Sequence, residues 1–376
     1  MIVSLDTLYV GRALAKAVES WLFRRYAIAP RNVLLIASHT HFAPSLDADK
    51  PRLGAVDQGY LSETVDRVCG LLDHLLTSEK SIEVMIGIGQ ESAPHNVNRR
   101  RPWPFPHRIG PRGVGFGPVT ASYRRGMRDP ILTVARLVDT AGSHRAVIVH
   151  YACHPVSYPR PLEVSADYIG IIRDALRKEY GPTTAVIFLQ GFAGDLRPLP
   201  PDARDRAPLT LSRRLYRLVR VVDQGPSDPP HTVDSWRKWA QLLASDAISA
   251  AHQGSLDPLT GSLRAAHTRV GLSEIVKNAT EGRFVEFRRF VVGDALDIVA
   301  VGAEPVVELK AMIPFPGALA VGYAGDVFGY WPTDAQLREG GYEAVGFQHS
   351  FSVPGPLLPG LDAAFARAIS KLISPQ

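Results

Sequence analysis

Five short apolar segments of this chain each run directly into a cluster of polar, chemically reactive residues, and this arrangement limits the folds the chain can adopt. Apolar runs of about four to eight residues are typical of buried strands. In α/β sheets, ligands bind beyond the carboxyl ends of the strands. The five clusters are therefore expected to converge on one pocket: Ser38-His39-Thr40-His41, His150-Tyr151-Ala152-Cys153-His154-Pro155, Gln190-Gly191-Phe192-Ala193-Gly194-Asp195, Gly302-Ala303-Glu304-Pro305, and Gly325-Asp326 with Tyr330 after it.

Helical and strand patterns alternate in the first half of the chain, and strand patterns gather in the second half. Helices are predicted at residues 8–26, 58–76, 167–180, 233–253 and 361–373. Strands are predicted at residues 1–6, 33–37, 82–90, 146–151, 185–189, 262–270, 283–292, 296–301 and 318–323. The pattern predicts a mixed α+β member of the α/β class, with a central mixed sheet flanked by helices.

Two other features of the sequence concern its loops and its division into domains. Residues 94–118 are rich in proline, glycine and arginine, which favours a long irregular loop. We find neither an internal repeat nor a clear linker, so we expect one catalytic domain over residues 1–376. A strand pattern that starts at residue 1 suggests that sequence upstream of it is missing.

The net charge of +5 comes partly from local arginine clusters at residues 99–101 and 213–220. Such clusters could form a surface for nucleic acid or anionic lipid, or simply be solvated faces of helices and loops. We favour solvated faces and expect no nucleic-acid partner, because no basic motif interleaved with aromatic residues is present. The sequence does not indicate the oligomeric state.

Apolar runs in the chain fall far short of the roughly 20 residues that a membrane helix needs, so no transmembrane segment is predicted. No charged region followed by an apolar leader is found at the N-terminus, which favours a cytoplasmic location for the chain as given. The two cysteines, Cys69 and Cys153, cannot form a disulfide framework.

Histidine and carboxylate residues dominate the clusters. In an extended backbone, His39 and His41 would point to the same side. With His154 and Glu304 they supply the imidazole nitrogens and carboxylate oxygen that suit zinc. Each residue alone could be an ordinary polar loop residue, and Glu304 could be a helix N-terminal charge.

The glycines of the third cluster allow two interpretations. Gly191 and Gly194 could turn backbone N–H groups toward a ligand as an oxyanion hole, or form an ordinary tight turn. Asp195 could orient a metal-bound histidine.

Six segments, in order along the chain, resemble motifs of the neutral/alkaline ceramidase family. Ser38-His39-Thr40-His41-Phe42-Ala43-Pro44 resembles the family's Ser-His-Thr-His-Ser-Gly-Pro, Asn96-Val97-Asn98-Arg99 resembles Asn-x-Asn-Arg, and His154-Pro155-Val156-Ser157-Tyr158 resembles His-Pro-Thr-Ser-Met. Residues 190–198 resemble Gln-Ser-Asn-x-Gly-Asp-Val-Ser-Pro, and Gly302-Ala303-Glu304-Pro305 resembles Pro-Gly-Glu-Phe. Gly329-Tyr330-Trp331-Pro332-Thr333 with Gly341-Tyr342-Glu343 resembles Tyr-x-x-Tyr-(Val/Ile)-x-Thr followed by Arg-Tyr-Glu.

The resemblance implies specific roles. A zinc ion would be held by four residues: His39, His154, Glu304 and Tyr330. His41 would lie beside the metal as a proton carrier, and Arg99 would reach the polar group of the substrate. His41, Arg99 and Tyr330 are therefore the predicted catalytic residues.

Several positions depart from the family pattern. Arg197 stands where the family has a serine linked to catalysis, and Phe42-Ala43 replaces Ser-Gly. Val327 replaces a tyrosine, and the family's first strand and C-terminal immunoglobulin-like domain are expected to be missing. The metal scaffold is thus kept while the substrate pocket is altered, so ceramide is not the expected substrate.

The substrate site is predicted to contain Arg99, Arg197, Gly194 and Asp195. Guanidinium groups favour carboxylate and phosphate, so the two arginines could recognise an anionic group on the substrate. Either arginine could instead form a structural ion pair with Asp195 or Asp326.

The sequence favours a zinc-dependent hydrolase that cleaves an amide (N-acyl) bond of a small molecule with metal-activated water. An ester or lactone hydrolase could use the same zinc site. A third alternative is an inactive homologue that binds a ligand or partner in the same cleft.

Overall fold

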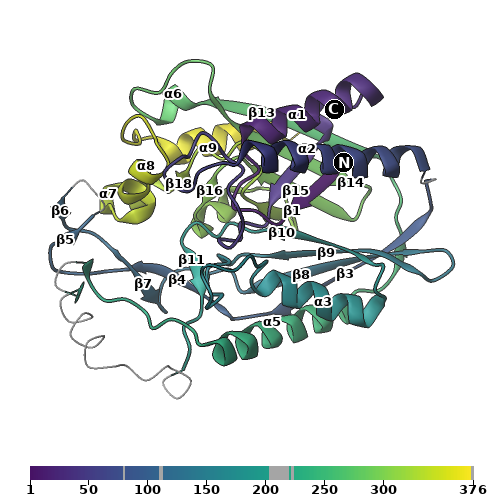
Figure 1. The fold of residues 1–376 in the computed structure, drawn as a ribbon, viewed down its shortest axis with the longest axis horizontal. Coiled ribbons are helices and arrows are strands. Elements are labelled where there is room, and N and C mark those ends of the chain that lie inside the picture. Colours follow the sequence, from purple (N-terminus) through teal and green to yellow (C-terminus); the bar gives the residue numbers. More distant parts are fainter. Residues whose placement is uncertain (79–80, 110–112, 203–219, 222–223, 374–376) are drawn as a thin grey trace.

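Two β-sheets lie face to face at the centre of the computed structural model, and helices cover the outer face of each sheet (Figure 1). The structure describes residues 1–78, 81–109, 113–202, 220–221 and 224–373. The basic segment of residues 213–220, apart from Arg220, lies outside the described residues. Among the described residues, none of the helices combines the length and hydropathy needed to cross a bilayer.

The first sheet has five strands in the order β10 (Ala185–Gln190), β9 (His144–Tyr151), β8 (Ile131–Asp139), β3 (Val84–Ser92) and β12 (Asp257–Pro258). Strands β10 and β9 are parallel, and the other neighbours are antiparallel. Helices α3 (Tyr168–Tyr180) and α5 (Val233–Gln253) pack on its outer face. Strand side chains alternate between faces, so Val147 and Val149 pack against these helices while Ile148 faces the second sheet.

The second sheet has the order β13 (Leu263–Gly271), β14 (Phe284–Val292), β15 (Leu296–Val301) and β17 (Leu319–Val321). Ile298 and Ala300 face the first sheet, whereas Val299 and Val301 face the outer helices. Those helices are α1 (Arg12–Tyr26), α2 (Gln58–Ser78) and α9 (Leu361–Ser370). Strands β1 (Ile2–Leu5) and β2 (Leu34–Ala37) form a parallel pair. One face of this pair packs in the core between the two sheets, and the other packs in the core beneath the outer helices.

Shorter elements surround the ends of the sheets. One small sheet contains β11 (Leu196–Pro198), β4 (Asn96–Arg101) and β7 (Val119–Tyr123), and two pairs are formed by β5 (His107–Arg108) with β6 (Val114–Gly115) and by β16 (Glu304–Pro305) with β18 (Tyr330–Trp331). The short helices are α6 (Leu272–Ile275), α7 (Asp334–Glu339) and α8 (Phe347–Ser350). Short 3₁₀ helices occur at η1 (Pro30–Asn32) and η4 (Val307–Met312), and a short π-helix occurs at η5 (Tyr342–Gly346).

The predicted mixed α+β fold class is confirmed, although the centre consists of two stacked sheets. The helix predicted from residue 8 begins only at Arg12. The irregular loop predicted at 94–118 is wrong in part, because β4, β5 and β6 interrupt it. Strand β4 is polar in sequence yet buried: Asn96 Nδ2, for example, donates to the carbonyl oxygens of Asp129 and Ala152. A strand stabilised by polar contacts lacks the apolar alternation by which strands are recognised.

Candidate active site

Five predicted site residues converge in the structure from segments that are far apart in the sequence. His39 and His41 follow β2, and His154 follows β9. Glu304 and Tyr330 begin β16 and β18 and lie opposite each other in that parallel pair. The strands that lead into the cluster belong to different sheets, so the pocket does not lie at one sheet edge as expected.

Donor atoms of this cluster have the spacing of a tetrahedral zinc site. The Nε2 atoms of His39 and His154 lie 3.4 and 3.2 Å from Oε2 of Glu304. The hydroxyl oxygen of Tyr330 is 3.4 Å from Nε2 of His154. A zinc ion with bonds of about 2.0–2.1 Å in tetrahedral geometry separates its ligands by about 3.3 Å. The imidazole and carboxylate donors therefore fit zinc in type, and these three separations fit it in spacing.

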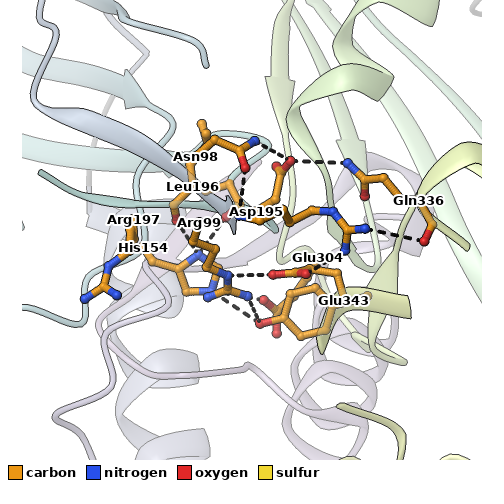
Figure 2. Close-up of polar contacts among 12 residues, drawn as sticks. Asn98, Arg99, His154, Asp195, Leu196, Arg197, Glu304, Gln336 and Glu343 are labelled. Carbon is orange, nitrogen blue, oxygen red and sulfur yellow. Dashed lines mark hydrogen bonds and ion pairs between the residues drawn. The ribbon is translucent and has the colours of Figure 1, made fainter. Parts of the chain in front are cut away.

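Backbone carbonyls orient both histidines. Nδ1 of His39 lies 3.0 Å from the carbonyl oxygen of Leu8. Nδ1 of His154 lies 2.6 Å from that of Ala193 and 3.0 Å from that of Leu196 (Figure 2). A carbonyl only accepts, so each Nδ1 carries the proton and each Nε2 lone pair is turned toward Glu304.

Asp195 does not orient His154, contrary to the sequence expectation. Its carboxylate accepts instead from Asn98 Nδ2 at 2.9 Å, from the Val307 N–H at 2.9 Å and from Gln336 Nε2 at 3.4 Å. Burial raises the pKa of Asp195 to about 6. Asp195 therefore ties β4 to the segment after β16 and acts outside the cluster.

Glu304 carries a buried oxygen that lacks a donor. Its Oε1 accepts from the Tyr9 hydroxyl. Its Oε2, which faces both histidines, has no hydrogen-bond partner among the described residues. Burial alone would raise the pKa of Glu304, but positive charge at the positions of His39 and His154 would lower it well below its usual value. An ionised, fully buried carboxylate oxygen without a donor is costly unless a cation lies beside it.

His154 is poised to be a neutral ligand. Burial, followed by the charge of Arg99, lowers the pKa of His154 to about 4, against the attraction of Glu304. Near neutral pH the site thus combines a neutral imidazole with an ionised carboxylate, which are the protonation states that metal binding requires.

His41 lies at the solvent side of the cluster. Its Nε2 is 3.4 Å from Nε2 of His39, and His41 as a residue is exposed whereas His39 is buried. One ring nitrogen from each of His39, His41 and His154 lies within 4.8 Å of the other two, a spacing at which the three histidines could also hold a metal ion. The extended backbone expected at His39 is wrong, because its φ is 67°, in a region that is rare for residues other than glycine and is concentrated at functional sites.

Arg99 contacts the cluster through Tyr330. Its Nη2 donates to the Tyr330 hydroxyl at 3.0 Å, and its Nε donates to Oε1 of Glu343 at 2.7 Å. Arg100 Nη1 donates to the other carboxylate oxygen of Glu343 at 2.8 Å. Burial alone would raise the pKa of Glu343, but the two guanidinium groups hold it below its usual value. Arg99 thus positions Tyr330 through a buried ion pair that the sequence reasoning did not assign.

The two arginines do not face one cleft. Arg197 forms an ion pair with Asp228 at 3.0 Å, and its guanidinium points away from Glu304 and Glu343 (Figure 2). The structural partners are thus Glu343 for Arg99 and Asp228 for Arg197, rather than the aspartates considered from the sequence. Each arginine thus has a carboxylate partner of its own, and joint recognition of a substrate anion stays a prediction.

The oxyanion-hole interpretation of the glycine cluster is also contradicted. The N–H of Gly194 donates to the Pro305 carbonyl at 2.8 Å, and that of Gly191 donates to the Tyr151 carbonyl at 2.9 Å. A Cβ at position 194 would lie 2.7 Å from the carbonyl oxygen of Glu304. Glycine is therefore needed at 194 for the close approach of the two backbones that carries Glu304 into the site.

A pocket of about 260 Å³ opens onto the cluster. Its lining residues are Leu8, Tyr9, His41, Ala43, Ser45, Leu53, Gly54, Tyr330, Tyr342 and Phe351. Tyr9 was missed from the sequence because it lies in the segment predicted to start a helix. Tyr323, also missed, stacks on His39 with ring centroids 4.2 Å apart. Neither residue belongs to a motif that could have marked it.

Solved structures of ceramidases share this fold. Neutral ceramidase from Pseudomonas aeruginosa superposes with a TM-score of 0.70 at 15% identity, over 98% of this chain and 66% of that one. A ceramidase complexed with C2 gives 0.69 at 15% identity, over 98% of this chain and 67% of that one. The chain thus has a ceramidase-like fold and spans about two-thirds of the length of these proteins. No protein-family model and no curated protein matches the sequence.

Proposed function

We propose that this chain is a zinc-dependent hydrolase that cleaves the amide bond of an N-acyl substrate. The observation that carries the proposal is Oε2 of Glu304, a buried carboxylate oxygen that has no hydrogen-bond donor in the part of the chain that the structure describes and lies 3.4 and 3.2 Å from two imidazole nitrogens. His39, His154, Glu304 and Tyr330 are the proposed zinc ligands. The ceramidase-like fold supports an amide as the scissile bond, since both structural neighbours are ceramidases.

When bound there, zinc would supply an acidified water and a Lewis acid that polarises the substrate carbonyl. The residues of the chain provide orientation and proton transfer. His41 is exposed in the pocket and reaches to 3.4 Å from His39, which places it to accept and return a proton at its Nε2 atom. Arg99 holds the Tyr330 hydroxyl through a 3.0 Å hydrogen bond and so keeps that oxygen directed at the site.

The test is release of amine from a panel of N-acyl amides by zinc-loaded protein, with matched esters assayed in parallel. His41→Asn should reduce amide hydrolysis by about 10²- to 10⁴-fold, the usual contribution of a general acid–base residue. His252→Asn is the matched control, because this exposed histidine pairs with Glu179 on the outer helices.

The alternatives predict other outcomes on the same panel. Turnover of esters alone identifies an ester hydrolase. Turnover of neither class, by protein shown to contain zinc, identifies a binding protein and refutes the proposal. Equal loss in both histidine variants would remove His41 from the mechanism.

A further inference from the structure

The pocket beside the histidine cluster is small and carries no strong charge. Among its described lining residues, none is an aspartate, glutamate, lysine or arginine. Its volume of about 260 Å³ lies below the 300–1,000 Å³ typical of pockets for drug-sized ligands. At about 30 Å³ for each water-sized group, it has room for roughly nine non-hydrogen atoms.

Aromatic contacts define the walls of the pocket. Phe351 lies between Tyr9 and Tyr330, with ring centroids 5.8 and 5.6 Å away in edge-on geometry. Tyr330 also packs on Tyr342 at 5.5 Å. Leu8 and Leu53 add apolar surface, while His41 and Ser45 are polar members of the lining. These rings contact one another, and Tyr9, Tyr330 and Phe351 belong to the buried core, so a bound group cannot gain room on that side of the pocket without disrupting packed side chains.

The nearby positive charges are already neutralised. Arg99 is 7% exposed, does not line the pocket, and is paired with Glu343. Arg197 is paired with Asp228 and points away from the site. A negative charge on the part of the substrate that enters the pocket would find no partner there, and an unpaired buried charge is unfavourable.

We propose that the pocket takes the acyl part of the substrate and that this acyl group is short, uncharged and apolar, with about eight or nine non-hydrogen atoms. The proposal rests on the proposed amide hydrolase function. It replaces the long-chain and anionic alternatives with compact acyl groups such as octanoyl or phenylacetyl.

Binding of a series of unbranched acyl hydroxamates to zinc-loaded protein, measured by calorimetry, tests the size limit without catalysis. Affinity should rise about fourfold with each methylene, as expected for burial of apolar surface, and should stop rising near eight carbons. An eight-carbon hydroxamate with a terminal carboxylate should bind at least about tenfold more weakly than the uncharged form.

Leu53→Ala removes three carbon atoms from the pocket lining. The chain length at which affinity stops rising should therefore increase by about two to three carbons. Val56→Ala is the matched control, since Val56 packs on the same core as Leu53 but does not line the pocket. In this control, affinity should stop rising at the same acyl chain length as in the wild-type protein.

Three results would overturn the proposal: affinity that keeps rising to sixteen carbons, tighter binding of the carboxylate form, or no binding of any hydroxamate to zinc-loaded protein. Hydrolysis of the corresponding N-acyl amides, measured in parallel, separates the two claims. Binding with the eight-carbon limit but without hydrolysis supports the pocket assignment and contradicts the proposed function. Hydrolysis that is fastest for a sixteen-carbon acyl group supports the function and contradicts the pocket assignment.

Discussion

Replacement of Glu343 by glutamine should destabilise the protein far more than a typical substitution of a surface acid. The Glu343 carboxylate is buried and binds Arg99 at 2.7 Å and Arg100 at 2.8 Å. The variant leaves two buried guanidinium groups without an anionic partner on that side. Removal of one member of a buried ion pair usually costs about 3–5 kcal/mol, so a loss in that range is expected in the free energy of unfolding by urea.

The matched control is Glu339→Gln. Glu339 also pairs with Arg100, at 3.0 Å, but its side chain is 60% exposed. An exposed pair of this kind contributes about 0–1 kcal/mol. If Glu343→Gln loses no more stability than Glu339→Gln, the Arg99–Glu343 pair is not what holds this part of the site.

The loss of stability caused by Glu343→Gln should change with pH in a direction that follows from the pKa of Glu343. The pKa of Glu343 is lowered by folding, below its ordinary value of 4.5. Its contribution is therefore fully present above pH 4.5 and is lost as the pH falls through the lowered pKa of the folded state. The stability gap between wild type and Glu343→Gln should be constant near neutral pH and should shrink in acid.

Two further predictions concern the site and the packing of the fold. Tyr9→Phe removes the hydroxyl that donates to the proposed zinc carboxylate and should weaken zinc binding about 10- to 100-fold, measured by competition with a chelator; an unchanged affinity would exclude a positioning role for Tyr9. Gly89→Ala should destabilise the protein, because its Cβ would overlap the backbone oxygen of Ala250 in α5. Gly70→Ala, at an exposed position of helix α2 with nothing within 4 Å of the new Cβ, should stabilise the protein by about 1 kcal/mol. Thermal unfolding measures both glycine variants. The opposite order of the two glycine variants would contradict the packing of α5 on β3.

Apolar periodicity predicted most of the fold, because the stacked sheets bury alternating residues. Strands β2, β9, β10 and β15 were recognised from apolar runs that end in polar clusters. Strand β4 was not, because its buried side chains are polar and are stabilised by contacts with distant segments, such as the bond from Asn98 to Asp195. Contacts of that kind depend on tertiary structure and leave no periodic pattern.

The candidate site was likewise predicted only in part from the sequence. Motifs identified the proposed site residues, and the structure brings His39, His41, His154, Glu304 and Tyr330 together. Supporting contacts were assigned wrongly or missed. Arg197 lies in a matching segment but turns to Asp228, and the atoms that orient His39 and His154 are backbone carbonyls, which have no sequence signal.

Elemental analysis of protein purified without chelator tests the central claim most directly. The account predicts about one zinc per chain. It also predicts a sharp drop in His154→Ala and no drop in His150→Ala, since His150 lies outside the cluster and bonds the Ala320 carbonyl at 3.0 Å. A zinc content near zero that added zinc does not restore, or full zinc content in His154→Ala, would contradict the account.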